Sequence, residues 1–154
     1  MFYFIIIVGV FLDLLSKFVA KVYLQDKLNI FGDYLYFEYF ENTGIAFSIQ
    51  IPSFFLKIIT ISLIILIFYY YNKEIKIDSN KGFSNLLSIS FGLILAGAIG
   101  NAYERIFNEK VVDFIGIKHF SVFNLADSFI FIGALFYLFI LYKNNKLGVF
   151  DQTK

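Results

Sequence analysis

The sequence predicts an all-α membrane protein, a bundle of four transmembrane helices with a small β-containing extracytoplasmic surface loop between the first two. Of its 154 residues, 59% are hydrophobic and only 16% are charged, which is too apolar for a soluble domain. Four apolar stretches are each long enough to cross a hydrocarbon core of about 30 Å, which takes about 20 helical residues. We expect residues 1–154 to form a single integral membrane domain.

The transmembrane helices are predicted over residues 1–22, 54–71, 83–106 and 122–142. Runs such as residues 58–67 are apolar on every face, whereas the strands of a membrane barrel would alternate apolar with polar residues. The first stretch has no basic start and is interrupted by Asp13 and Lys17. We therefore expect a retained helix there, not a cleaved secretion signal.

The loop over residues 24–53 contains an aromatic, partly alternating stretch, residues 33–40, which predicts short strands on the membrane surface. The third helix carries Gly92, Ala96 and Gly100 at four-residue spacing, so another helix can approach it closely along this stripe.

Lysines indicate how the chain is oriented in the membrane. Six of them lie in the connection between the second and third helices and in the tail, against four in the other two loops. Since positive loops stay in the cytoplasm, we expect both termini there and the other two loops outside.

Composition excludes several kinds of chemistry. The chain has no cysteine, so it can form no disulfide, thiolate metal site or cysteine nucleophile. Its single histidine, His119, argues against a histidine metal cluster. A net charge of +1 gives no reason to expect a nucleic-acid partner. We therefore expect neither a metal nor a cofactor.

Polar residues of the four crossings gather toward one membrane face. In an up-down-up-down bundle, the end of the first helix, the end of the third and the start of the fourth lie at the same level. The side chains predicted to meet there are Asp13, Lys17, Asn42, Asn101, Arg105, Asp113, Asn124 and Asp127. Scattered solvated charges would not converge in this way.

Each polar residue also has a purely structural interpretation. Asp13 and Lys17, four residues apart, can form an ion pair near the interface, with Lys17 reaching outward to water. Arg105, the only arginine in the chain, offers a planar fork of donors for a carbonyl or carboxylate, but it could also be an interfacial anchor. Asn124 could cap the fourth helix, whereas Asp127 lies one turn inside, where we do not expect capping.

With no cysteine and no obvious serine–base pair, the simplest chemistry for two carboxylates is an aspartyl dyad of Asp113 and Asp127. Two nearby acids share one proton, so the ionised member can activate water while the protonated member hydrogen-bonds a scissile carbonyl. A small proton-coupled transporter or channel also places carboxylates in helices, and a membrane scaffold would use them only as caps and anchors. The second helix has no ionisable residue after Lys57, which disfavours a transport path across the membrane.

The sequence contains five motif blocks: DLLSK (13–17), ENTGIAF (41–47), GAIGNAYER (97–105), VVDF (111–114) and FNLADS (123–128). In this order they resemble the motifs of bacterial lipoprotein signal peptidase, also called signal peptidase II. The resemblance implies an aspartic endopeptidase of the bacterial inner membrane, with Asp113 and Asp127 as the catalytic pair. Its substrate would be a prolipoprotein, cut just before a cysteine that carries diacylglycerol.

The resemblance assigns further roles. Residues that would line the substrate cleft are Asn42, Gly44, Asn101, Arg105 and Asn124, with the arginine and the asparagines holding the peptide backbone. Asp13 and Lys17 would support the site. It also implies an extracytoplasmic active site and inhibition by cyclic peptide antibiotics such as globomycin. Besides substrate and inhibitor, we expect only membrane lipids as partners, because nothing in the sequence demands more than a monomer. The chain departs from the family at Glu104, where an aspartate usually precedes the arginine.

Overall fold

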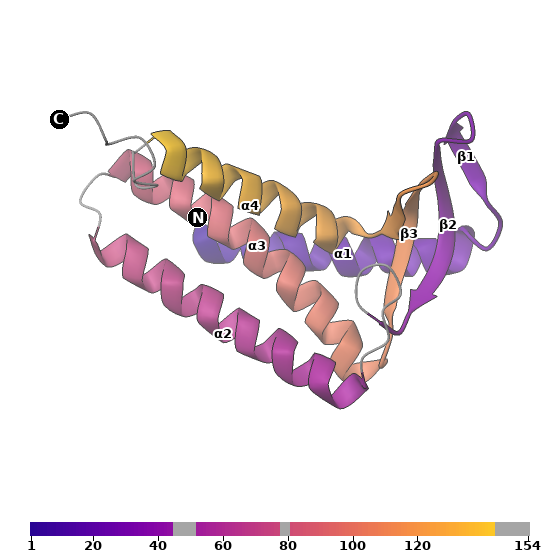
Figure 1. Ribbon diagram of the computed structural model, residues 1–154, viewed down its shortest axis with the longest axis horizontal. Helices are drawn as coiled ribbons and strands as arrows, with labels where there is room; N and C mark the ends of the chain where they lie inside the picture. The colour runs from indigo at the N-terminus through magenta and orange to yellow at the C-terminus, as the bar shows by residue number, and fades with distance from the viewer. Residues whose placement is uncertain (45–51, 78–80, 144–154) are drawn as a thin grey trace.

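The computed structural model describes residues 1–44, 52–77 and 81–143. In this part of the chain, four long apolar helices carry a small antiparallel sheet at one end (Figure 1). The helices are α1 (Phe2–Tyr23), α2 (Ser53–Ile77), α3 (Lys81–Phe107) and α4 (Leu125–Lys143). Each is long and apolar enough to cross a membrane, which confirms the four predicted apolar helices.

Two helix boundaries differ from the prediction by three residues or more, and the others differ by one or two. Helix α2 continues six residues past the predicted end at Tyr71, because the polar stretch that follows contains no glycine or proline and continues the helix. Helix α4 begins at Leu125, three residues later than predicted, because residues 121–123 pair in the sheet. Hydropathy thus marked the apolar core of each helix more accurately than its ends.

Helix α3 lies at the centre of the bundle, and the other three helices pack against it. The predicted stripe of Gly92, Ala96 and Gly100 is the surface on which α1 packs. A methyl group on Gly100 would overlap the Asp13 carboxylate, and one on Gly9 of α1 would lie only 2.6 Å from the Ala96 side chain. The stripe therefore lets α1 approach closely enough for the buried Asp13 carboxylate to reach the Ala126 N–H at the start of α4.

The two ends of the bundle differ in chemistry. The N-terminus lies in the half of the molecule away from the sheet (Figure 1), and the apolar cluster there includes Phe2, Phe91 and Ile140. In contrast, the four buried charged side chains among the described residues all lie in the half nearer the sheet: Asp13, Lys17, Glu104 and Asp113. Large apolar side chains cover the outward faces of the helices, as contact with lipid requires.

The sheet is formed by two loops that lie at the same end of the bundle, one between α1 and α2 and the other between α3 and α4. Its strands follow the order β1 (Leu28–Phe31), β2 (Leu35–Asn42), β3 (Val111–Ile117) and β4 (Ser121–Phe123). Strands in the first loop were predicted, but none were predicted between the third and fourth helices. That prediction was incomplete: β2 pairs with β3, with Phe40 opposite Asp113 and Asn42 opposite Val111. This pairing brings the two loops into one site.

Candidate active site

Asp113 lies in the middle of the sheet, on β3, and only 5% of it is exposed. Its carboxylate accepts two amide hydrogen bonds, from Asn42 Nδ2 at 2.9 Å and from Asn124 Nδ2 at 2.8 Å. Burial raises the pKa of Asp113 to about 6, and the negative charge of Asp127 acts in the same direction. The two amides and the charge of Lys17 oppose this rise. Asp113 is thus a carboxyl group that can hold a proton close to neutral pH.

Asp127 lies in the first turn of α4. It accepts hydrogen bonds from Asn101 Nδ2 at 2.8 Å and from the Asn124 backbone N–H at 3.2 Å, while its own N–H donates to Asn124 Oδ1 at 2.9 Å. This reciprocal pair is a capping box, so Asn124 does cap α4. Our expectation that Asp127 takes no part in capping was wrong. Because the Asn124 side chain also donates to Asp113, one residue contacts both carboxylates, Asp113 through its side chain and Asp127 through its backbone N–H.

Each carboxylate faces asparagine amides whose direction is fixed. The three amides belong to Asn42, Asn101 and Asn124. Their oxygens are already engaged, by the backbone N–H of Gly44, the ammonium of Lys17 and the backbone N–H of Asp127, respectively. Since an amide oxygen that accepts on one side leaves its N–H groups to face the other, all three present donors to the dyad.

Lys17 is the centre of a buried ion cluster behind the dyad. Its ammonium lies 2.8 Å from Asp13 Oδ2 and 3.1 Å from Glu104 Oε2, and donates to Asn101 Oδ1 at 2.9 Å. The predicted ion pair within the first helix is therefore present. The alternative in which Lys17 reaches outward to water was wrong, because only 2% of the residue is exposed. The other oxygen of Asp13 accepts from the Ala126 N–H at 2.9 Å, which ties α1 to the start of α4.

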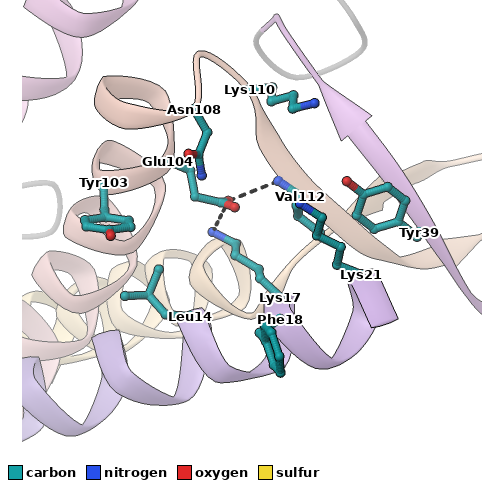
Figure 2. A pocket seen from close by; sticks show the side chains of 10 residues that line it. All are labelled: Leu14, Lys17, Phe18, Lys21, Tyr39, Tyr103, Glu104, Asn108, Lys110 and Val112. Atoms are coloured by element: carbon teal, nitrogen blue, oxygen red, sulfur yellow. Dashed lines mark hydrogen bonds and ion pairs between the residues drawn. The ribbon is translucent and has the colours of Figure 1, made fainter. Parts of the chain in front are cut away.

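Glu104 extends this cluster to the sheet, since Oε2 also accepts from the backbone N–H of Val112 at 3.0 Å. Figure 2 shows both contacts of Glu104 at the inner end of a cavity of about 450 Å³. The side chains around this cavity come from α1, β2, α3, β3 and the loop that precedes β3. From the sequence, Glu104 was recognised only as a departure from the family pattern, with no predicted role. Its place three residues after Asn101, on the same face of α3, was the signal for its role.

Two predicted site residues stand apart from the cluster. Arg105 is half-buried in the last turn of α3 and makes no hydrogen bond or ion pair with any residue that the structure describes. Gly44 contributes its N–H to Asn42 and ends a described segment, so residues 45–47 of its motif block lie outside the described residues.

Asn101 and Asn124 are 5% and 0% exposed, and their amides contact the aspartates. In this structure they hold the carboxylates instead of facing an open cleft. Within residues 1–44, 52–77 and 81–143, no three His, Cys, Asp or Glu side chains are grouped closely enough to hold a metal ion.

Comparison with known proteins gives the family. The family model described as signal peptidase (SPase) II matches residues 5–143. A lipoprotein signal peptidase of Caldicellulosiruptor bescii is 41% identical over 157 residues, covering 100% of this chain and 99% of the relative. Those of Halothermothrix orenii and Clostridium tetani are 32% and 31% identical, covering 96% and 92% of this chain and 99% and 92% of theirs.

Solved structures agree with this. One, described as a bacterial membrane enzyme determined by the in meso method at 2.3 Å resolution, superposes with a TM-score of 0.80 at 26% identity, covering 99% of this chain and 94% of its own. A second, at 1.9 Å resolution, gives a TM-score of 0.76 at 26% identity, with 91% of each chain covered. With a family model and full-length relatives in agreement, this chain belongs to the signal peptidase II family of lipoprotein signal peptidases.

Proposed function

We propose that this chain removes the signal peptide from diacylglyceryl-modified prolipoproteins, cutting just before the lipidated cysteine, with Asp113 and Asp127 as its catalytic dyad. One observation carries the proposal. Two carboxylates from different elements both bond to Asn124, Asp113 to its side-chain amide and Asp127 to its backbone N–H, and burial raises the pKa of Asp113 to about 6. Such a pair can hold a single proton between two acids, which is what metal-free peptide hydrolysis requires.

In the proposed reaction Asp113 begins protonated and Asp127 begins ionised. Asp127 takes a proton from water as the water oxygen attacks the scissile carbonyl carbon, and Asp113 gives its proton to the carbonyl oxygen. As the C–N bond breaks, the leaving amine takes the proton from Asp127, and a hydroxyl of the intermediate returns a proton to Asp113. The dyad ends as it began, so the cycle needs no further reactant.

The substrate would enter sideways from the bilayer, since its signal helix and acyl chains are lipid-soluble. The aromatic residues of the first loop lie in the sheet beside Asp113, which supports a platform at the membrane surface. Arg105, unpaired within the described segments, and Asn42 are suited to hold the peptide backbone. Asn101 and Asn124 would instead position the acids. The remaining expectations, which stay part of the proposal, are a monomer in the bacterial inner membrane, an active site on the extracytoplasmic face, cytoplasmic termini and sensitivity to globomycin-like peptides.

The transporter alternative receives less support from the geometry. The buried charged residues in the described parts of the chain occupy only the half of the bundle near the sheet, and the opposite end is closed by apolar and aromatic side chains. A proton relay would need ionisable groups along the whole crossing.

Purified protein incubated with a diacylglyceryl-modified prolipoprotein tests the proposal. We expect Asp113→Asn and Asp127→Asn each to lower the cleavage rate by at least about 10³-fold, because an amide keeps the shape and loses the acid–base cycle. Asp33→Asn, which changes a carboxylate that is 68% exposed, is the matched control and should cleave normally. Substrate without diacylglycerol should be cut poorly. Cleavage retained by either dyad variant would remove that residue from the mechanism.

A further inference from the structure

Glu104 lies where α1, α3 and β3 meet, and only 6% of the residue is exposed. A single oxygen, Oε2, accepts from Lys17 Nζ at 3.1 Å and from the Val112 N–H at 3.0 Å (Figure 2). Val112 directly precedes Asp113 on β3. One carboxylate oxygen of Glu104 therefore contacts both Lys17, the centre of the buried ion cluster, and β3, the strand that carries Asp113.

Glu104 also reaches the second acid, through Lys17. The Lys17 ammonium donates to Asn101 Oδ1, and Asn101 in turn donates to Asp127 Oδ1. Displacing Lys17 would remove one of the two donors, the other being Asn124 Nδ2, that turn the Asn101 amide toward Asp127. Glu104 is thus connected to Asp113 through the backbone of β3 and to Asp127 through two side chains.

We infer that Glu104 is a positioning residue for the dyad, an inference that rests on the proposed function. The Glu104 carboxylate holds β3 in place and balances part of the Lys17 charge. Both the length and the charge of the side chain matter to this role. An aspartate at the same backbone position reaches roughly 1.5 Å less far and cannot keep both contacts. A glutamine reaches equally far but carries no charge.

The charge of Glu104 has a consequence for proton binding by the dyad. Titratable and charged groups that surround it are Asp13, Lys17 and Lys21 of α1, Tyr39 and Glu41 of β2, Lys110, and Asp113. The charge of Lys17 already lowers the pKa of Asp113. Without Glu104, less of that positive charge is balanced, so the dyad binds its proton less tightly. One unit charge at about 10 Å shifts a pKa by roughly one unit when the effective dielectric constant is about 20.

Two variants separate length from charge: Glu104→Gln and Glu104→Asp. Cleavage of the lipidated prolipoprotein is measured from about pH 4.5 to 9, with Glu109→Gln, which changes a carboxylate that is 71% exposed, as the control. In Glu104→Gln, both limbs of the profile should move to lower pH by about half a unit to one unit. In Glu104→Asp, the limbs should stay in place while kcat falls at least about fivefold. The control should match the wild type in both respects.

A second readout does not depend on turnover. Hydrogen exchange at the Val112 amide should accelerate at least about tenfold in Glu104→Asp, because the amide loses its acceptor. Unmoved limbs in Glu104→Gln, equal shifts in both variants, or unchanged exchange at Val112 would each overturn the role of Glu104. If Glu104→Gln does not fold, exchange in Glu104→Asp still decides. Failure of the wild type to cleave would instead overturn the proposed function.

Discussion

Replacing Asp113 by asparagine should stabilise the folded protein above pH 6 although it removes one of the two proposed catalytic acids. Burial raises the pKa of Asp113 from 3.8 to about 6, so folding makes its ionised form less favourable. The sign of the change in the free energy of unfolding follows from the linkage between proton binding and folding. Because the folded-state pKa is the higher one, the stabilising contribution of the protonated group is complete below pH 3.8 and is lost as the pH rises through 6.

The size of the effect follows from the same shift. A rise of about 2 pKa units corresponds to about 3 kcal/mol, lost between roughly pH 4 and pH 7. Asparagine avoids this loss, but it can accept only one of the two amide hydrogen bonds that reach Asp113, which costs about 1 to 2 kcal/mol. We therefore expect the variant to be less stable than the wild type at pH 4 by that amount, and more stable at pH 7.5 by about 1 kcal/mol.

Reversible unfolding in mixed micelles of dodecyl maltoside and dodecyl sulfate, repeated from pH 4 to pH 8, measures this difference. The free energy of unfolding of Asp113→Asn minus that of the wild type should change sign near pH 5. Asp33→Asn, which removes a carboxylate that is 68% exposed, supplies the baseline. If the difference for Asp113→Asn does not vary with pH, the environment does not disfavour the ionised form of Asp113, and the proposed dyad loses its support.

Two further variants probe the donors and the packing. Asn42→Ala removes a hydrogen bond that lowers the pKa of Asp113, so the alkaline limb of the cleavage profile should move to higher pH while kcat falls about tenfold or more; a limb that moves downward would contradict this. Gly97→Ala places a methyl group against the Ala126 backbone oxygen, which should lower the free energy of unfolding by about 2 kcal/mol in the same micelle titration, and an unchanged value would show that α4 can shift freely.

Much of the fold followed from hydropathy, because an apolar run of about 20 residues has few other uses. The prediction failed where backbone pairing decides the structure. Residues 111–117 are rich in β-branched side chains, but a connection so short between two helices gave no sign of a partner strand. Its partner, β2, lies some 70 residues earlier, and Asn42 reaches Asp113 only through that pairing. Neither segment alone therefore predicts which residues of the two strands lie opposite each other.

The convergence of the polar residues was predictable, whereas their individual contacts were not. Helix order and direction bring Asp13, Asn101 and Asp127 to one level, so sequence alone could group them. The first helix considered alone predicted that the Lys17 side chain extends to the interface, because a lysine near a helix end ordinarily extends toward water. It stays buried because Glu104, from another helix, adds a second carboxylate to that of Asp13. A rule that considers one helix at a time cannot supply that partner.

The side-chain donors around Asp113 and Asp127 suit the proposed sharing of a proton between the two carboxylates. A lysine or arginine in direct contact would favour the ionised form of both acids and remove the shared proton. Amide groups instead supply directional hydrogen bonds without a net charge, and they are the side-chain donors that contact Asp113 and Asp127 in the described part of the chain. The buried ammonium of Lys17 instead donates to Asn101, one of these amides, and the carboxylates of Asp13 and Glu104 balance its charge. If the Lys17 charge lay closer to Asp113 and Asp127, or lost the carboxylates that balance it, proton sharing between the two acids should therefore weaken more than the stability of the fold.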